Sequence, residues 1–152
     1  MLAYFGLAEP SGMLDVMYGA GFQKDRVAGF AKVLAGLAGG GDPFSQWLFA
    51  KAGRELGANL RALAARAPPL EGQLAVVAVG SVWKSWPLLR DAFLRAAYAG
   101  GSRLAGGFRL LRLKESSAVG AAWRAAQLAG VELPLDTGAL TEVLFESAGP
   151  PA

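Results

Sequence analysis

The chain has 152 residues, which is enough for one domain with a core. Of these, 53% are hydrophobic and 18% are charged, a composition that excludes an intrinsically disordered protein. Cysteine and histidine are both absent, which excludes disulfide scaffolds, Cys/His zinc sites, cysteine nucleophiles and Ser-His-Asp triads. The formal net charge is +3, but the arginines are scattered among alanines and leucines, so we expect no nucleic-acid partner.

No apolar run reaches the roughly 18 uncharged residues that a membrane helix needs. The first residues, MLAYFGLAEP, are apolar, but no basic segment precedes them and Glu9 follows, unlike in a signal peptide. We therefore expect a cytoplasmic protein that has no membrane partner.

The first helices are predicted over residues 10–18 and 25–38, the second with apolar residues at three- and four-residue steps. Asp25 is the predicted N-cap of this second helix. Three glycines at 39–41 then end it. A phosphate-binding loop would need a strand before the glycines, so we interpret them as a turn between two helices.

The longest helix is predicted to start at Pro43, with Asp42 as its N-cap, and to stop before Pro68 and Pro69. A stripe of apolar residues recurs along it at helical spacing and is predicted to face the core. The stripe consists of Phe44, Leu48, Ala52, Leu56, Leu60 and Leu63.

The second half of the chain alternates between strands and helices. Residues 74–79, LAVVAV, predict a continuously buried strand of the kind found in parallel sheets, and a helix is expected from about Trp83 to Tyr98. Residues 108–113 predict a second strand, with one less buried face or at an edge. Residues 139–152 are expected to form a C-terminal helix and tail.

One more helix is predicted after the second strand, capped by Ser116 and Ser117 and ending near Leu128. The strand, helix and strand together predict a right-handed βαβ unit in a helix-rich α/β fold. Ligands of such sheets lie beyond the carboxyl ends of the strands, where this chain has VGSVWKS and KESSAVG. Two strands are too few to cover this many helices, so strands that should pair with them are missing.

The segment GSVWKSW at 80–86 carries the candidate chemistry. It lacks the glycine before the lysine and the spacing of a Walker loop. Gly80 would let a flat ring approach the backbone, and Ser81 and Ser85 could offer hydroxyls to a ribose or a base. Trp83 and Trp86 could wall a pocket or pack in the core. From spacing alone, a nucleotide pocket and a plain strand-to-helix cap both stay open.

VAVGSVWKSWPLL resembles the adenosine motif of the N-acetylglucosamine kinases, which belong to the sugar-kinase, actin and heat-shock chaperone superfamily. Residues 25–57, with AGF and GDP-x-S in register, resemble a helical stretch of that family. LKESSAVGAAW resembles its closing strand-to-helix segment, with Glu115 where the family often has histidine. The resemblance is collinear over residues 10–138 and implies that 1–138 is the C-terminal part of the second lobe of a sugar kinase.

The resemblance implies a partial ribonuclease-H-like, actin-like ATPase lobe that lacks the antiparallel strands preceding it in the family. It implies that Ala28, Ser81 and Ser85 contact the nucleotide, with Gly80 at the point of close approach. Trp83, Lys84 and Trp86 match the family phrase but are expected to have packing roles. Small residues keep the following helix tight against the sheet, namely Gly120, Ala121 and Ala122.

The phosphate loops, the catalytic aspartate and the sugar-binding residues of the family have no counterpart in this chain. The resemblance therefore implies a fragment of an ATP-dependent kinase that phosphorylates the 6-hydroxyl of N-acetylglucosamine. We expect it to be inactive alone, because ATP phosphates, Mg²⁺ and the sugar would be held by the missing part. We name no catalytic residue and no metal ligand.

The alternative function is a non-catalytic module, derived from such a kinase, that binds a nucleotide or another protein. The bare edge of strand 74–79 is expected to cause marginal stability or association, as a homodimer for example.

Overall fold

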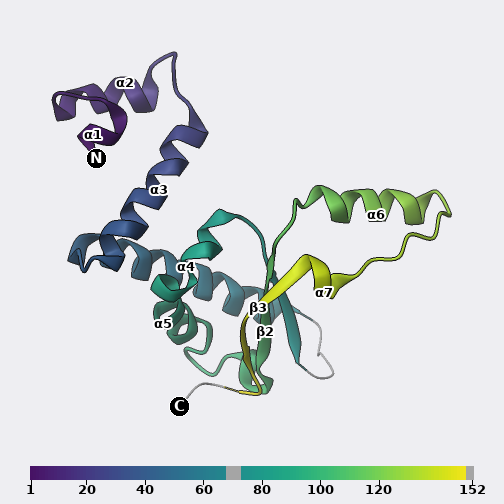
Figure 1. Ribbon diagram of the computed structural model, residues 1–152. Coiled ribbons are helices and arrows are strands. Elements are labelled where there is room, and N and C mark those ends of the chain that lie inside the picture. The colour runs from purple at the N-terminus through teal and green to yellow at the C-terminus, as the bar shows by residue number, and fades with distance from the viewer. Residues whose placement is uncertain (68–72, 150–152) are drawn as a thin grey trace. The chain divides into compact units, whose positions relative to one another are not determined.

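The computed structural model describes residues 1–67 and 73–149, and its contacts divide the chain into two compact units, Met1–Phe49 and Ala50–Ala152 (Figure 1). The boundary lies within helix α4 (Pro43–Arg66), which begins where predicted. The prolines predicted to stop this helix, Pro68 and Pro69, and the last residues of the predicted tail lie outside the described residues. No helix in the described ranges is long and apolar enough to cross a membrane.

The first unit is helical. Its core is a cluster of three rings, Tyr4, Phe5 and Phe30, with centroids 4.9–5.5 Å apart. The guanidinium of Arg26 donates a 2.8 Å hydrogen bond to the carbonyl of Phe5 and lies 5.7 Å from the centre of its ring. The elements are α1 (Leu2–Phe5), the 3-10 helix η1 (Pro10–Gly12), α2 (Met13–Tyr18), α3 (Lys24–Gly39) and the start of α4.

The turn between α3 and α4 confirms two of the local predictions. The glycines at 39–41 form a helix-to-helix turn, in which Gly41 has a positive φ of 93°. The carboxylate of Asp42 accepts a 2.7 Å hydrogen bond from the backbone N–H of Ser45 and so caps α4. The prediction for Asp25 is wrong, because α3 starts one residue earlier and Gln23 is its N-cap.

The second unit contains a small mixed sheet of order β1-β2-β3. Strands β1 and β2 are parallel and joined through α5, as the predicted βαβ unit requires. Strand β3 is antiparallel to β2 and occupies half of the region 139–152, which was predicted to be a helix and tail, so that prediction is wrong for Thr141–Ser147. The remaining elements are β1 (Leu74–Ala78), η2 (Ser81–Ser85), α5 (Trp86–Ala97), η3 (Arg103–Gly106), β2 (Phe108–Leu113), α6 (Ala118–Leu128), α7 (Thr137–Leu140) and β3 (Thr141–Ser147).

The position of β2 corrects the sequence analysis, which allowed it to be an edge strand. It lies in the centre, with a partner strand on each side. The other prediction, one less buried face, is confirmed, because Phe108 and Leu110 are fully buried whereas Arg109 between them is exposed. Strand β1 is also less buried than predicted, since its side chains alternate and Val77 is 55% exposed. One face of the sheet is therefore the core, and the other is open to solvent at Val77.

The pairing of β2 with β3 is stabilised by two ion pairs as well as by backbone hydrogen bonds. Arg112 donates to both carboxylate oxygens of Glu142, at 2.9 and 2.7 Å, and Arg109 lies 3.5 Å from Glu146. Gly107 precedes β2 with a φ of 82°, and a Cβ there would collide with the carbonyl oxygen of Ser147. Only glycine therefore allows β3 to approach the start of β2 this closely.

The core of the second unit lies between α4, α5 and the inner face of the sheet. In α4 the buried residues include Gly53, Gly57, Leu60 and Ala64. The prediction for Leu60 is therefore confirmed, but the rest of the predicted stripe is displaced by about one residue of rotation, and Leu63 is exposed. Glycine is needed because a Cβ at Gly57 would lie 3.0 Å from the Phe93 carbonyl carbon. The α5 residues that complete the core are Trp86, Leu89, Ala92, Phe93, Leu94 and Ala97.

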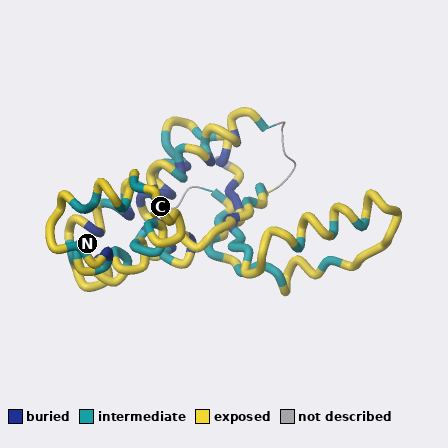
Figure 2. The backbone as a smooth tube through the Cα atoms, turned by 90° about the horizontal axis from the view of Figure 1, so that it is seen from above, coloured by how far each residue is buried: buried dark blue, intermediate teal, exposed yellow. Residues whose placement is uncertain are grey.

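Helix α6 departs most from the prediction. It has no buried residue, and in Figure 2 it is the yellow and teal segment at the right. Gly120, Ala121 and Ala122 are all exposed, and a Cβ built at Gly120 would have no neighbouring atom within 4 Å among the described residues. The prediction that these small residues hold the helix against the sheet is therefore wrong, because α6 does not pack on it.

Candidate functional site

The candidate site is the connection from β1 to α5. Gly80 ends the extended chain with φ 109° and ψ 162°, a conformation that side-chain-bearing residues rarely adopt. A Cβ there would meet no described atom within 4 Å, so the space beside the backbone is open. The glycine is thus required by the backbone angle, and it leaves one side of the chain accessible.

The two tryptophans of this connection pack into the core against α5. The Trp83 and Trp86 rings are buried and lie 5.7 and 5.4 Å from the ring of Phe93, in edge-to-face arrangements. Trp83 lies in η2 and Trp86 is the first residue of α5, so each of the two elements contributes one ring to this contact. Their predicted packing role is confirmed. They anchor η2 to α5 and leave its remaining side chains on the outside.

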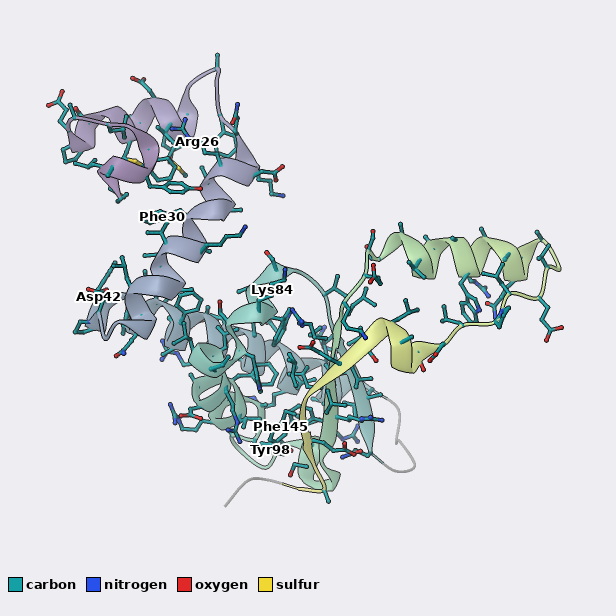
Figure 3. The ribbon with its side chains drawn as sticks, viewed as in Figure 1. Arg26, Phe30, Asp42, Lys84, Tyr98 and Phe145 are labelled. Carbon is teal, nitrogen blue, oxygen red and sulfur yellow. The ribbon has the colours of Figure 1, made fainter. Side chains whose placement is uncertain are left out.

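The outer side of η2 presents small polar groups. Ser81 is exposed and Ser85 is half-buried, and neither hydroxyl is engaged with another residue of the described ranges. Lys84 is exposed near the end of the same 3-10 helix, so the packing role predicted for it is wrong (Figure 3). Gly80, Ser81 and Ser85 therefore come together on one connection, with hydroxyls able to donate and accept hydrogen bonds.

Because β1 and β2 are parallel, their carboxyl ends share one edge of the sheet. At the end of β2 stand Arg112 and Lys114, and the backbone N–H of Lys114 donates a 2.9 Å hydrogen bond to Leu140. The hydrogen bonds from Arg112 hold the pKa of Glu142 below its ordinary value, with a smaller contribution from the charge of Lys114. Glu142 is therefore ionised at neutral pH and poorly suited to accept a proton.

Sequence reasoning missed this Arg112–Glu142 pair. The two residues lie thirty positions apart, and their contact depends on a strand that was predicted to be a helix and tail. The alternation of TEVLFES is the signal that could have indicated a strand.

Ala28, the remaining predicted nucleotide contact, lies at an exposed position of α3 in the first unit. In the described residues no group of three or more carboxylates could hold a metal ion. No protein family model matches the chain.

Proposed function

We propose that the chain supplies the adenosine side of an ATP site in a protein related to the N-acetylglucosamine kinases. The observation that carries the proposal is the accessible backbone at Gly80, followed by the free hydroxyls of Ser81 and Ser85, at the carboxyl end of a strand in a βαβ unit. The resemblance of VAVGSVWKSWPLL to the adenosine motif of that family supports the same assignment. The actin-like fold of the second lobe is part of this proposal.

The chemistry of the site fits a nucleoside better than a phosphate. Two hydroxyls and an open backbone can receive a flat ring and a ribose, whereas a phosphate would find the exposed Lys84 on this connection but not Arg112, which is already paired with Glu142. The rigid packing of Trp83 and Trp86 on Phe93 would keep both serines in place without a ligand.

Phosphoryl transfer is proposed only for the complete family fold. There, Mg²⁺ and the γ-phosphate would be held outside this chain, and positioning with charge stabilisation would supply most of the acceleration. The chain alone is proposed to have no kinase activity. A coupled assay that detects turnover dependent on both ATP and N-acetylglucosamine would contradict this.

Isothermal titration calorimetry with ADP tests the binding site. A Ser81→Trp variant fills the open side of η2, whereas Ser11→Trp makes the same change at an exposed serine of a 3-10 helix in the first unit. We expect binding by the parent chain and by Ser11→Trp, and at least about tenfold weaker binding by Ser81→Trp, which corresponds to about 1.4 kcal/mol. Equal affinities of Ser81→Trp and Ser11→Trp for ADP would contradict the proposal that ADP binds at η2.

The alternative, a module that binds another protein, is favoured by a different observation. The outer face of the sheet and the whole of α6 expose apolar residues, among them Val77, Val143 and Leu128. Exposed apolar surface of this kind marks interaction sites.

A further inference from the structure

The side chains of η2 are distributed over three sides of a short helix. A 3-10 helix has three residues per turn, so side chains three positions apart lie one above the other. Ser81 and Lys84 therefore share one side. Val82 and Ser85 share a second side, and Trp83 alone occupies the third, where it is buried in the core. The connection thus offers a ligand two sides that differ in their chemistry.

The side of η2 that carries Val82 and Ser85 suits a base. Val82 is 38% exposed, and Val79, just before Gly80, is 55% exposed, so apolar surface is available to a flat ring. Removing that surface from water would favour binding of the ring. The Ser85 hydroxyl can donate or accept a hydrogen bond at the polar edge of the base. A base placed here leaves the ribose to the side of Ser81.

The side that carries Ser81 also carries a positive charge. Lys84 is exposed, and its ammonium group makes no ion pair or hydrogen bond with another described residue. The two ion pairs between β2 and β3 use Arg109 and Arg112 instead. The Lys84 charge is therefore available to a ligand, and lysine is a common phosphate-binding residue because its ammonium acts as a compact point charge.

We propose that Lys84 binds the phosphate group attached to the ribose, so that this connection takes a nucleoside 5′-phosphate in preference to the nucleoside. That phosphate is joined directly to the sugar, so a cation three residues from the Ser81 hydroxyl lies on the side of η2 where the phosphate would be. This role rests on the proposed function, because Lys84 has it only when a nucleoside lies against η2. It gives the chain itself one contact with phosphate.

The contribution of Lys84 should be modest, because the side chain is exposed. Water and salt screen a pair of charges at the surface, so we expect a preference for the phosphate of about threefold or somewhat more. Lys114 is a matched control. It is also exposed, and it follows the adjacent parallel strand β2, but it does not belong to η2.

Isothermal titration calorimetry with adenosine and with AMP tests this role. We expect the parent chain and Lys114→Gln to bind AMP at least about threefold more tightly than adenosine. For Lys84→Gln we expect equal affinities for the two ligands. Adenosine has no phosphate, so its binding shows that each variant is folded and still has the nucleoside site. Lys84→Arg keeps the positive charge and should keep the preference for AMP.

The salt dependence of the parent chain tests the same role without any substitution. The preference for AMP should fall as the ionic strength rises, because salt screens the attraction between ammonium and phosphate. Equal affinities of the parent chain for AMP and adenosine, or a preference that persists in Lys84→Gln, would overturn the role of Lys84 and leave the nucleoside site standing. Equal loss of the preference in Lys114→Gln would also overturn it. A parent chain that binds neither ligand would contradict the proposed function, and the role of Lys84 with it.

Discussion

Helices α5 and α6 have similar lengths, 12 and 11 residues, and each follows a strand of the same sheet, but their packing differs completely. Helix α5 buries six residues, including two aromatic ones, whereas α6 buries none. Most of α6 consists of alanine and glycine, and its largest side chain, Trp123, donates a hydrogen bond to the carbonyl of Leu133 in the segment that follows.

The comparison shows which property of a helix builds this core. Large side chains on α5 reach the inner face of the sheet, as Phe93 reaches Phe108, so each buried ring removes much apolar surface from water. Small residues permit close approach, but they do not produce it. Gly53 and Gly57 lie directly against the α5 backbone at Leu89 and Phe93, two residues whose large side chains are buried in the core.

The largest effect is expected from Phe93→Ala. Phe93 is 1% exposed and contacts both tryptophans, so its removal should lower the free energy of unfolding by about 3–5 kcal/mol. The matched change in α6, Trp123→Ala, should cost no more than about 1.5 kcal/mol, mainly from its lost hydrogen bond. Chemical denaturation followed by circular dichroism measures the free energy of unfolding of both variants. Equal losses would contradict the conclusion that α5, and not α6, builds the core.

A pair of identical substitutions should have opposite effects. Gly57→Ala inserts a methyl group against the Phe93 carbonyl and should destabilise the chain by about 1–3 kcal/mol. Gly120→Ala lies in open space within a helix and should stabilise it by about 0.5–1 kcal/mol, since alanine loses less backbone entropy. Thermal unfolding distinguishes the two. If Gly120→Ala were as damaging as Gly57→Ala, α6 would be packed after all.

The smallest effects are expected at the helix starts. Asp42→Ala should lower the melting temperature at neutral pH, whereas Ser117→Ala should leave it unchanged, because the Ser117 side chain makes no capping hydrogen bond. The neighbouring Ser45 side chain and its backbone N–H lower the pKa of Asp42 from 3.8.

The pH dependence of the Asp42 cap follows from the direction of that shift. A carboxylate whose native pKa is lowered stabilises the fold above its unfolded pKa and loses this contribution as the pH falls through the native pKa. The difference between the parent chain and Asp42→Ala should therefore be constant at neutral pH and shrink only below about pH 4. A difference that disappears nearer neutral pH would contradict this assignment.

Local signals predicted much of the fold. The helix-to-helix turn at 39–41, the cap at Asp42 and the order β1-α5-β2 depend on neighbouring residues, and the structure confirms them. The central position of β2 depends on its pairing with β3 between residues 28 to 39 positions apart, which no local pattern shows. The strand β3 itself has a local signal in the alternation of TEVLFES, which the sequence analysis did not use. In α4 the helical period was correct, but the stripe was misplaced because apolar residues were preferred over the glycines that face α5.

Part of the candidate site could also be predicted. The packing role expected for Trp83 and Trp86 is observed, and Gly80 leaves one side of the backbone open, as its missing Cβ predicted. The positive φ of Gly80 was not predicted. The ion pair of Arg112 with Glu142 could not be anticipated, because it requires the register of β3.

The central claim is tested most directly by recording backbone amide NMR spectra of the chain during titration with ADP. The account predicts chemical shift changes concentrated at Gly80, Ser81 and Ser85, with amides of α6 and of the outer edge of β3 unchanged. A well-dispersed spectrum that ADP leaves unaltered, or changes concentrated away from the β1–α5 connection, would contradict it.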